Sequence, residues 1–209
     1  LQKEGDIPGE SRLKKLRREL PGLSPEAEDF YPVTQKGRVV LSAKEVLSAV
    51  NEFRRFPLGP RRIQTSADEL EHRAKLRLRH MEEESDRNSD ASEQLEESEE
   101  RRLENDYGGA IQNIRKYAWL NISHLVQRIL GTSQITETEW LCAKLSLTGL
   151  CDRNMRYVMI DEVQDYTRAQ LEILRRYYPN ARFMLLGDEF QSIREGTVPF
   201  LDIEELCRE

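Results

Sequence analysis

Hydrophobic residues recur at helical spacing near the start of the chain and predict a short amphipathic helix over residues 11–20. Leu13, Leu16 and Leu20 fall on one face of this helix, at intervals of three and four residues. The other positions are mainly basic: Arg12, Lys14, Lys15, Arg17 and Arg18. These side chains could contact phosphate or an acidic partner, but a solvated helix face is the commoner explanation and is favoured here.

The pattern then changes to a short strand over residues 39–41, where three aliphatic side chains follow one another. A helix is predicted directly after it, because Ser42 and Glu45 have the spacing of a capping box. Leu41 before the cap and Val46 after it have the positions of a hydrophobic staple. This helix is expected to end before a cluster of prolines and glycine.

A second capping sequence, from Ser66 to Glu69, predicts the start of a long helix. Its apolar positions are Leu70, Ala74, Leu78 and Met81. The apolar stripe then ends, and residues 82–106 contain twelve acids against three arginines. Such a composition cannot bury enough apolar surface to fold alone. The segment is therefore predicted to be a solvated helical arm or a disordered acidic loop.

Residues 111–129 carry a clean helical periodicity and predict a single core helix. Its apolar face consists of Ile111, Ile114, Ala118, Ile122, Leu125 and Ile129. His124 on this helix is interpreted as a packing residue rather than a ligand. Gly131 is expected to end the helix, and a capping sequence from Thr136 to Glu139 predicts a further helix that reaches about Leu147.

Residues 156–186 predict a strand, a helix and a second strand in that order. The first strand contains a continuous apolar run, Val158 to Ile160, which is typical of a strand buried on both faces. A capping sequence from Thr167 to Gln170 begins the helix, and residues 182–186 form the second strand. A right-handed crossover is expected to join the two strands in parallel, so the loops that follow them should meet at one edge of the sheet.

Composition limits the class of protein. The 209 residues are 38% hydrophobic and 33% charged, and their net charge of −6 argues against a general nucleic-acid-binding surface. Cys142, Cys151 and Cys207 include no C-x-x-C pair, so reduced thiols in a cytoplasmic protein are expected. No apolar run approaches a membrane span, and no signal peptide is visible. The first residue is Leu1 rather than methionine, which indicates a piece of a larger protein.

Two acids, Asp161 and Glu162, follow the strand over residues 156–160 directly. Ligands bind at the C-terminal ends of strands in open α/β sheets. The pair resembles a Walker B element, in which the first acid helps to hold Mg²⁺ and the second positions the attacking water. A solvated acidic turn after a buried strand is the alternative. The phosphate-binding sequence G-x-x-x-x-G-K-[ST] is absent, since the chain contains no Gly-Lys pair.

The sequence Asp161-Glu162-Val163-Gln164-Asp165 resembles motif II of the UvrD/Rep-type superfamily 1 helicases. The segment from Leu185 to Ile193, LLGDEFQSI, resembles their motif III. The resemblance implies an α/β fold with a partial RecA-like parallel sheet of the P-loop NTPase type. A large, mainly helical insertion would precede the Walker B strand. ATP and Mg²⁺ are the cofactors that it implies for the complete protein.

The resemblance also implies roles for individual residues. Asp161 would be a ligand of Mg²⁺, Glu162 the base that orients the attacking water, and Gln191 the sensor of the γ-phosphate. These three residues would bind the nucleotide. The residues that would couple motif II to motif III are Gln164, Asp165, Gly187 and Asp188.

Within this group the chain is similar to the HelD-type helicase-like factors of bacterial RNA polymerase. Tyr166, the run Ala169-Gln170-Leu171 and residues 178–183 match that type, and a long helical segment precedes motif II. DNA helicases soon reach an aromatic residue that stacks on a base, whereas residues 194–199 contain none. The resemblance therefore implies an ATPase that remodels or releases bacterial RNA polymerase.

Two other functions stay open. One is an ATP-dependent DNA helicase of the UvrD/Rep type, acting in repair or replication. The other is an interaction scaffold with a degenerate site, against which the intact Asp161, Glu162 and Gln191 argue.

Three regions are expected along the chain. Residues 1–35 would form a basic N-terminal helix and linker. Residues 36–135 would form a mainly helical insertion, with an acidic arm at about 66–106. Residues 136–209 would form part of the first RecA-like ATPase domain. The segment from about Phe30 to Leu130 is predicted to bind protein rather than DNA, because its arginines are mixed with acids or placed at its ends.

Overall fold

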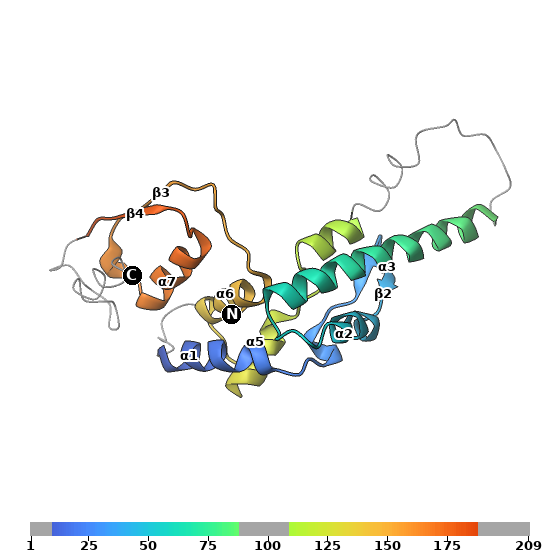
Figure 1. Cartoon of the computed structure of the whole chain (residues 1–209), viewed down its shortest axis with the longest axis horizontal. Coiled ribbons are helices and arrows are strands. Elements are labelled where there is room, and N and C mark those ends of the chain that lie inside the picture. Colours follow the sequence, from blue (N-terminus) through green and yellow to red (C-terminus); the bar gives the residue numbers. More distant parts are fainter. Residues whose placement is uncertain (1–9, 88–108, 188–209) are drawn as a thin grey trace. The chain divides into compact units, whose positions relative to one another are not determined.

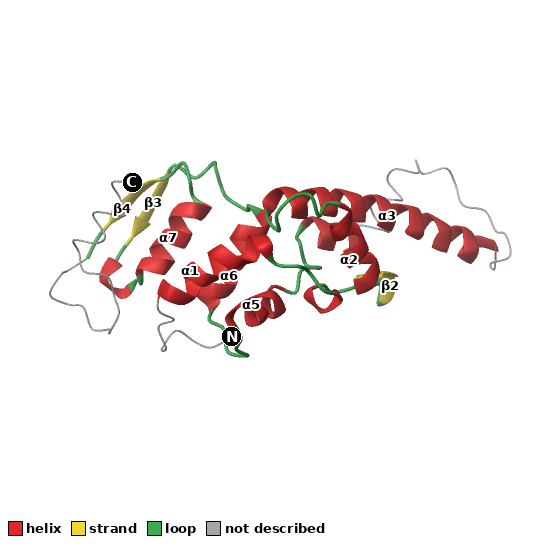
Figure 2. Cartoon of the chain, turned by 60° about the horizontal axis from the view of Figure 1, so that its bottom comes forward, coloured by secondary structure: helices red, strands yellow, loops and turns green. Residues whose placement is uncertain are grey.

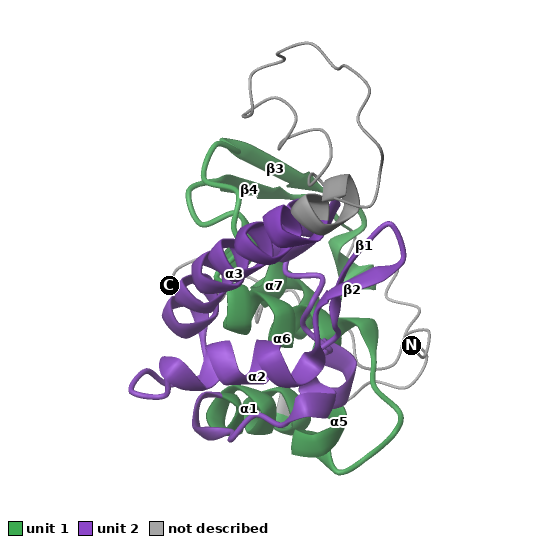
Figure 3. Ribbon diagram, turned by 90° about the vertical axis from the view of Figure 1, so that its right-hand side faces the viewer, with its two compact units in different colours: residues 1–20, 126–209 green, residues 21–125 purple. Residues whose placement is uncertain are grey.

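The computed structural model describes residues 10–87 and 109–187 of the 209-residue chain. Helices predominate, and two small two-stranded sheets give the chain a mixed α/β fold (Figure 1, Figure 2). The chain divides into two compact units (Figure 3). Unit 1 comprises Leu1–Leu20 and Val126–Glu209, and unit 2 comprises Pro21–Leu125. No helix among the described residues is long and apolar enough to cross a membrane.

Unit 1 begins with helix α1 (Glu10–Glu19), which confirms the first predicted helix. Its apolar face is buried at Leu13 and Leu16, and a short 3-10 helix, η1 (Leu20–Gly22), follows. The rest of the unit contains the end of α5 (Ile122–Leu130), then α6 (Glu137–Thr148) and α7 (Arg168–Tyr177). Helix α6 packs against both α1 and α7.

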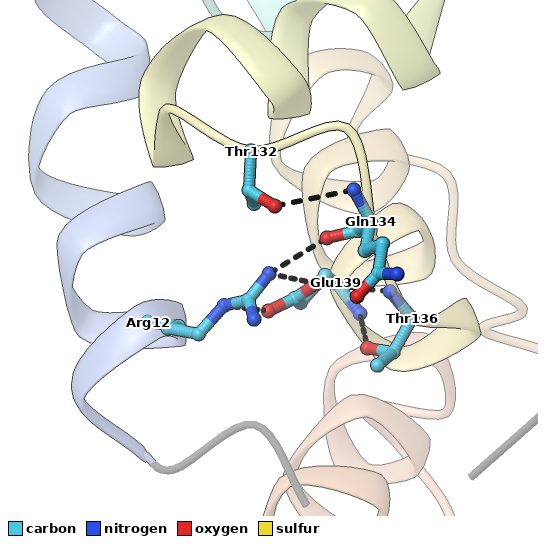
Figure 4. Close-up of polar contacts among 5 residues, drawn as sticks. All are labelled: Arg12, Thr132, Gln134, Thr136 and Glu139. Atoms are coloured by element: carbon cyan, nitrogen blue, oxygen red, sulfur yellow. Dashed lines mark hydrogen bonds and ion pairs between the residues drawn. The ribbon is translucent and has the colours of Figure 1, made fainter. Parts of the chain in front are cut away.

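Two arginines of α1 are held by acids of unit 1, so neither interpretation of the basic face applies to them. Arg12 lies at the N-terminus of α6 (Figure 4), where its Nε is 2.7 Å from Oε1 of Glu139. Its Nη2 also donates to the carbonyl oxygen of Gln134 at 3.0 Å. Nη2 of Arg17 is 2.7 Å from Oε2 of Glu172 on α7. These pairs fasten α1 to both helices.

Strands β3 (Tyr157–Ile160) and β4 (Arg182–Leu185) form a parallel pair, with α7 as the connection between them (Figure 2). Tyr157 lies opposite Arg182, and Ile160 lies opposite Leu185. The predicted order of strand, helix and strand is therefore confirmed, together with the parallel pairing. The carboxyl ends of both strands meet at one edge of this sheet.

The prediction that β3 is buried on both faces is wrong. Ile160 is buried and packs with Val163 and with Leu171 of α7, but Tyr157 is 71% exposed and Met159 is 66% exposed. Because alternate residues of a strand point to opposite faces, α7 covers one face of the pair. The other face is uncovered by any part of the chain that the structure describes. A continuous apolar run does not by itself indicate how many faces are covered.

Unit 2 contains the 3-10 helix η2 (Ala27–Asp29) and an antiparallel hairpin of β1 (Val33–Gln35) and β2 (Arg38–Leu41). Lys36 and Gly37 both have positive φ, 48° and 77°, as a type I′ turn requires. The sequence predicts β2 but not β1, which is three residues long and has a single buried side chain.

Helix α2 (Ala43–Glu52) starts at the predicted capping box. The backbone N–H of Ser42 donates to Oε2 of Glu45 at 2.8 Å, and the N–H of Glu45 donates to Oγ of Ser42 at 3.4 Å. The staple residues Leu41 and Val46 are both buried. The strand and the helix that follow one another in the sequence are therefore confirmed.

Helix α3 (Pro60–Arg87) starts before the predicted position at Ser66. Proline suits the first position of a helix, where its missing N–H has no role, so Pro60 opens α3 instead of only ending α2. Ser66 is buried inside the helix, and its hydroxyl donates to the carbonyl oxygen of Arg62 at 2.7 Å. The expected stripe of Leu70, Ala74 and Leu78 is buried. Residues 88–106 of the acidic segment lie outside the described residues.

The prediction of one continuous helix over residues 111–129 is wrong. Residues 109–115 are helical, but the chain then turns, and α5 is a separate helix. Tyr117 has a φ of 56°, which is incompatible with a right-handed helix. Asn121 caps the new helix, because its Oδ1 accepts the N–H of His124 at 3.3 Å.

The interpretation of His124 as a packing residue agrees with its surroundings in unit 2. Its Nδ1 is 2.8 Å from Oδ1 of Asp29, a fully buried side chain. Oδ2 of the same aspartate accepts the N–H of Glu26 at 2.8 Å. The histidine and the aspartate therefore satisfy one another inside the fold.

Candidate functional site

The candidate site is the loop that follows β3. Asp161 and Glu162 leave the carboxyl end of this strand, and both side chains are exposed. Oδ1 of Asp161 accepts the backbone N–H of Glu162 at 2.9 Å. The backbone thus orients the first carboxylate, and the two acids stand side by side at the end of a parallel strand.

Glu162 has φ of 51° and ψ of 47°, a left-handed conformation that non-glycine residues rarely adopt. It precedes the 3-10 helix η3 (Val163–Asp165), and its carbonyl oxygen accepts the N–H of Asp165 at 2.9 Å. Strained backbone of this kind persists only where the surrounding structure fixes it, and it is concentrated at functional sites. The sequence gives no signal for this conformation.

Main-chain contacts to the end of β4 fix this loop. The N–H of Val163 donates to the carbonyl oxygen of Leu186 at 2.9 Å, and the N–H of Leu186 donates to that of Ile160 at 2.8 Å. Val163 is fully buried. The predicted motif II loop is therefore bonded to the first residues of the predicted motif III. Sequence reasoning missed Val163 and Leu186, because their contribution is made by the backbone.

Gln164 joins the same two segments through its side chain. It is 6% exposed, and its Nε2 donates to Oε2 of Glu162 at 2.5 Å. A Cβ atom added to Gly187 would lie 2.9 Å from Cγ1 of Val163 and closer still to Oε1 of Gln164. Only glycine therefore fits at position 187 without a shift of its neighbours. The structure brings together Glu162, Gln164 and Gly187, three of the predicted site residues.

Three further residues, Asp165, Asp188 and Gln191, belong to the predicted site. Asp165 is exposed at the end of η3. Asp188 and Gln191 lie outside the described residues, so the predicted sensor of the γ-phosphate has no position here.

The side chains at this loop fit the requirements of a Mg²⁺–nucleotide site. Mg²⁺ prefers oxygen ligands and is commonly held by one or two carboxylates together with substrate phosphates and water. Asp161 and Glu162 offer two adjacent exposed carboxylates, at the sheet edge where nucleotides bind in α/β proteins.

The sequence matches a known protein family over a range that includes this loop. The model of the UvrD/REP helicase N-terminal domain matches residues 14–195. The match includes both the acidic pair after β3 and the segment after β4, which is bonded to Val163 of the same loop. No curated protein matches the chain. Since the family model extends over most of the sequence, the chain belongs to the UvrD/REP helicase N-terminal domain family.

Proposed function

We propose that the chain supplies the metal-binding and water-orienting half of the nucleotide site in an ATP-dependent DNA helicase. The observation that carries the proposal is the position of Asp161 and Glu162, directly after a parallel strand, in a loop bonded to the end of its neighbour. Membership of the UvrD/REP family adds the expectation of a helicase-like ATPase. Strands β3 and β4 would be two strands of a RecA-like sheet.

Each residue of the loop would have a separate task. Asp161 would hold Mg²⁺, which neutralises charge on the β- and γ-phosphates of bound ATP. Glu162 would accept a hydrogen bond from the attacking water and orient it. Because Gln164 donates to one oxygen of this carboxylate, it would keep the other oxygen directed to the water. Gln191 would contact the γ-phosphate.

Gln164 and Gly187 would couple the nucleotide site to motif III. Gln164 bonds to the proposed base and at the same time packs against the chain after β4. A displacement of Glu162 would therefore be transmitted to Gly187 and to the residues beyond it, Asp188 and Gln191.

Bacterial RNA polymerase is the second candidate target, and one feature favours it. Residues 82–106 contain twelve acids against three arginines, and such a segment could compete with nucleic acid for a positively charged channel. The similarity to HelD-type factors stays a prediction. DNA is preferred as the target because the family that the chain matches is one of helicases.

The catalytic half of the proposal is tested by Glu162→Gln in the full-length protein. The variant removes the base but keeps Asp161, so ATP hydrolysis should fall by about 10²–10⁴-fold while binding of a fluorescent ATP analogue is retained. Glu137→Gln, which removes an equivalent charge from an exposed residue of α6, should leave both measurements unchanged. Hydrolysis by Glu162→Gln at the wild-type rate would refute the assignment.

The choice of target is tested by stimulation of hydrolysis. Single-stranded DNA should raise the steady-state ATPase rate of the full-length protein, and core RNA polymerase without DNA should not. The reverse result would identify the polymerase as the target and would leave the assignment of the nucleotide site intact.

A further inference from the structure

An arginine-rich loop connects α2 and α3 in unit 2. We call residues 53–62 the arginine loop. It contains Arg54, Arg55, Arg61 and Arg62, and no acid occurs between residues 53 and 67, although the chain as a whole has a net charge of −6. Arg54, Arg55 and Arg61 are exposed, whereas Arg62 is buried. The loop is therefore a local concentration of positive charge in an acidic protein.

Two of these arginines lie against one aromatic ring. The guanidinium carbon of Arg55 lies 4.9 Å from the ring centroid of Phe56, and that of Arg61 lies 4.2 Å from it. A cation positioned over an aromatic face at this distance is attracted to the ring. Arg55 and Arg61, which are separated in the sequence, therefore both lie against one ring, and both side chains are exposed.

Hydrogen bonds attach the arginine loop to neighbouring residues of unit 2. Leu58 is buried, and its N–H donates to the carbonyl oxygen of Pro21 at 2.9 Å. Arg62 donates from Nε to the carbonyl oxygen of Val50 at 3.0 Å and from Nη2 to Oδ1 of Asn51 at 3.1 Å. Burial lowers the pKa of Arg62 from its ordinary value. These bonds join the end of α2 to the start of α3 and fix the loop between them.

Three other arginines of unit 2 pair with acids. Arg73 pairs with Glu52 and Glu69, Arg77 pairs with Glu45, and Arg115 pairs with Glu71. No carboxylate among the described residues pairs with Arg54, Arg55 or Arg61. Ion pairs within the part of the chain that the structure describes therefore do not account for the three exposed arginines of the loop.

We infer that the arginine loop binds the phosphate backbone of DNA. Guanidinium groups match phosphate with two parallel N–H donors, and one anchored loop presents three exposed guanidinium groups that no carboxylate of the described residues pairs with. Because guanidinium groups already lie over the ring of Phe56, we assign it to holding the arginines and not to stacking on a base. Contacts to phosphate position a protein without reading sequence.

The inference rests on the proposed function, since DNA is the substrate proposed there, and it adds a second contact outside the nucleotide site. It departs from the prediction that the segment from about Phe30 to Leu130 binds protein rather than DNA. That prediction rests on arginines that are mixed with acids or placed at the ends of the segment, whereas Arg55 and Arg61 lie against one ring on a loop that contains no acid.

The test measures the salt dependence of DNA binding. Binding of a fluorescein-labelled oligonucleotide, as single strand and as duplex, is followed by anisotropy between about 50 and 200 mM salt. In full-length protein, the triple variant Arg54→Ala, Arg55→Ala, Arg61→Ala should bind more weakly to every sequence. The slope of log K against log salt should decrease in magnitude by about 2 to 3, because each lost phosphate contact removes about 0.7 to 0.9.

Two controls separate charge from folding. Arg77→Ala removes an exposed arginine of the same unit whose charge Glu45 neutralises, and it should leave the slope unchanged. The triple replacement of Arg54, Arg55 and Arg61 by lysine keeps the charge and should restore most of the slope. Circular dichroism should show equal helix content in all variants.

The outcomes distinguish this inference from the proposed function. DNA binding and DNA-stimulated hydrolysis that the triple alanine variant leaves unchanged would overturn the inference and leave the proposed function standing. Absence of DNA binding by the wild type would overturn both. A triple variant that loses binding to a poly-glutamate peptide, with an unchanged DNA slope, would overturn the inference in favour of an acidic protein partner.

Discussion

At the scale of single residues, the site depends on the left-handed backbone of Glu162 and on the close approach of Gly187 to Val163 and Gln164. Glu162 has a left-handed conformation, and Val163, directly after it, is buried and bonded to Leu186. Gly187 leaves room for Gln164, which in turn donates to Glu162. The proposed base is thus held by contacts that come from two segments of the sequence.

Gly187→Ala tests this packing. The added Cβ would lie 2.9 Å from Cγ1 of Val163 and even closer to Oε1 of Gln164, so at least one of these side chains must move. Overpacking of this kind costs about 1–3 kcal/mol of unfolding free energy, measured by urea denaturation. Gly22→Ala is the control, because nothing lies within 4 Å of its added Cβ. Equal stability of the two variants would contradict the packing described here.

Glu71 gives a prediction about pH. A hydrogen bond from Arg115, with a further one from Lys75, lowers the pKa of Glu71 from 4.5 to about 2. A carboxyl with a lowered pKa in the folded state stabilises the protein above its unfolded pKa. This contribution is lost as the pH falls from about 4.5 towards 2. Because Arg115 is 65% exposed, solvent screening limits the effect to about 1 kcal/mol.

The measurement compares unfolding free energies at about pH 6 and pH 3, values on either side of the unperturbed pKa. Glu71→Gln should show a smaller loss of stability between the two than the wild type. Asp68→Asn, at an exposed acid of the same helix, should behave like the wild type. A loss in Glu71→Gln as large as that in the wild type would argue against the stabilised carboxylate.

At the scale of elements, capping sequences predicted helix starts where the cap residue follows a loop. The boxes at Ser42, Thr136 and Thr167 are all formed. The same spacing at Ser66 is misleading, because the helix has already begun at Pro60. A serine followed by an acid three residues later occurs within helices too, and the pattern alone does not distinguish the two cases.

The break between residues 115 and 122 could not be predicted from apolar periodicity. Ile114 and Leu125 are buried on either side of it, so both pieces bury the expected face and the pattern continues across the turn. Tyr117 has a positive φ, which a tyrosine in the sequence does not indicate. Asn121 is the one local clue, since asparagine is a preferred N-cap.

The same limit applies to the candidate site. Asp161, Glu162, Gln164 and Gly187 are predicted as site residues because their segments resemble motifs II and III of the helicases. The strain at Glu162 and the backbone bond from Val163 to Leu186 arise only when β3 and β4 pair. Main-chain hydrogen bonds of this kind can form with almost any side chain, so the residue types do not indicate them.

Two capping boxes of the same type should differ in their contribution to stability. Glu139 is fully buried and pairs with Arg12 (Figure 4). Glu45, in contrast, is 38% exposed. Glu139→Ala leaves the guanidinium without its carboxylate and the N–H of Thr136 without its acceptor. Breaking a fully buried pair costs about 3–5 kcal/mol. Because the side chain of Arg12 is 37% exposed, Glu139→Ala should cost less than that, but more than the loss of an exposed cap, about 1 kcal/mol.

Urea denaturation of Glu139→Ala and Glu45→Ala provides the comparison. Glu139→Gln retains a capping side chain, and it should be intermediate because it removes the charge alone. Similar losses of stability in the two alanine variants would show that the pair with Arg12 contributes nothing beyond the cap.

At the scale of the whole molecule, the sequence would supply one part of the proposed nucleotide site and contains no phosphate-binding sequence for the other. The acidic pair at Asp161 and Glu162 stands at the end of a parallel strand, but no Gly-Lys pair occurs anywhere in the sequence. In P-loop enzymes, the backbone N–H groups and the lysine of that sequence cradle the phosphates. The two carboxylates alone would repel a triphosphate unless Mg²⁺ lay between them.

The 209-residue chain by itself should therefore hydrolyse ATP no faster than a control without protein. Its binding of a fluorescent ATP analogue should also be weak and should require Mg²⁺, since the phosphate-binding loop that would retain the nucleotide is missing from this sequence. Hydrolysis is measured by release of phosphate from the purified chain, and Glu162→Ala identifies any activity that belongs to the site. Turnover by the wild-type chain that this substitution abolishes would mean that the described residues form a complete active site without a P-loop.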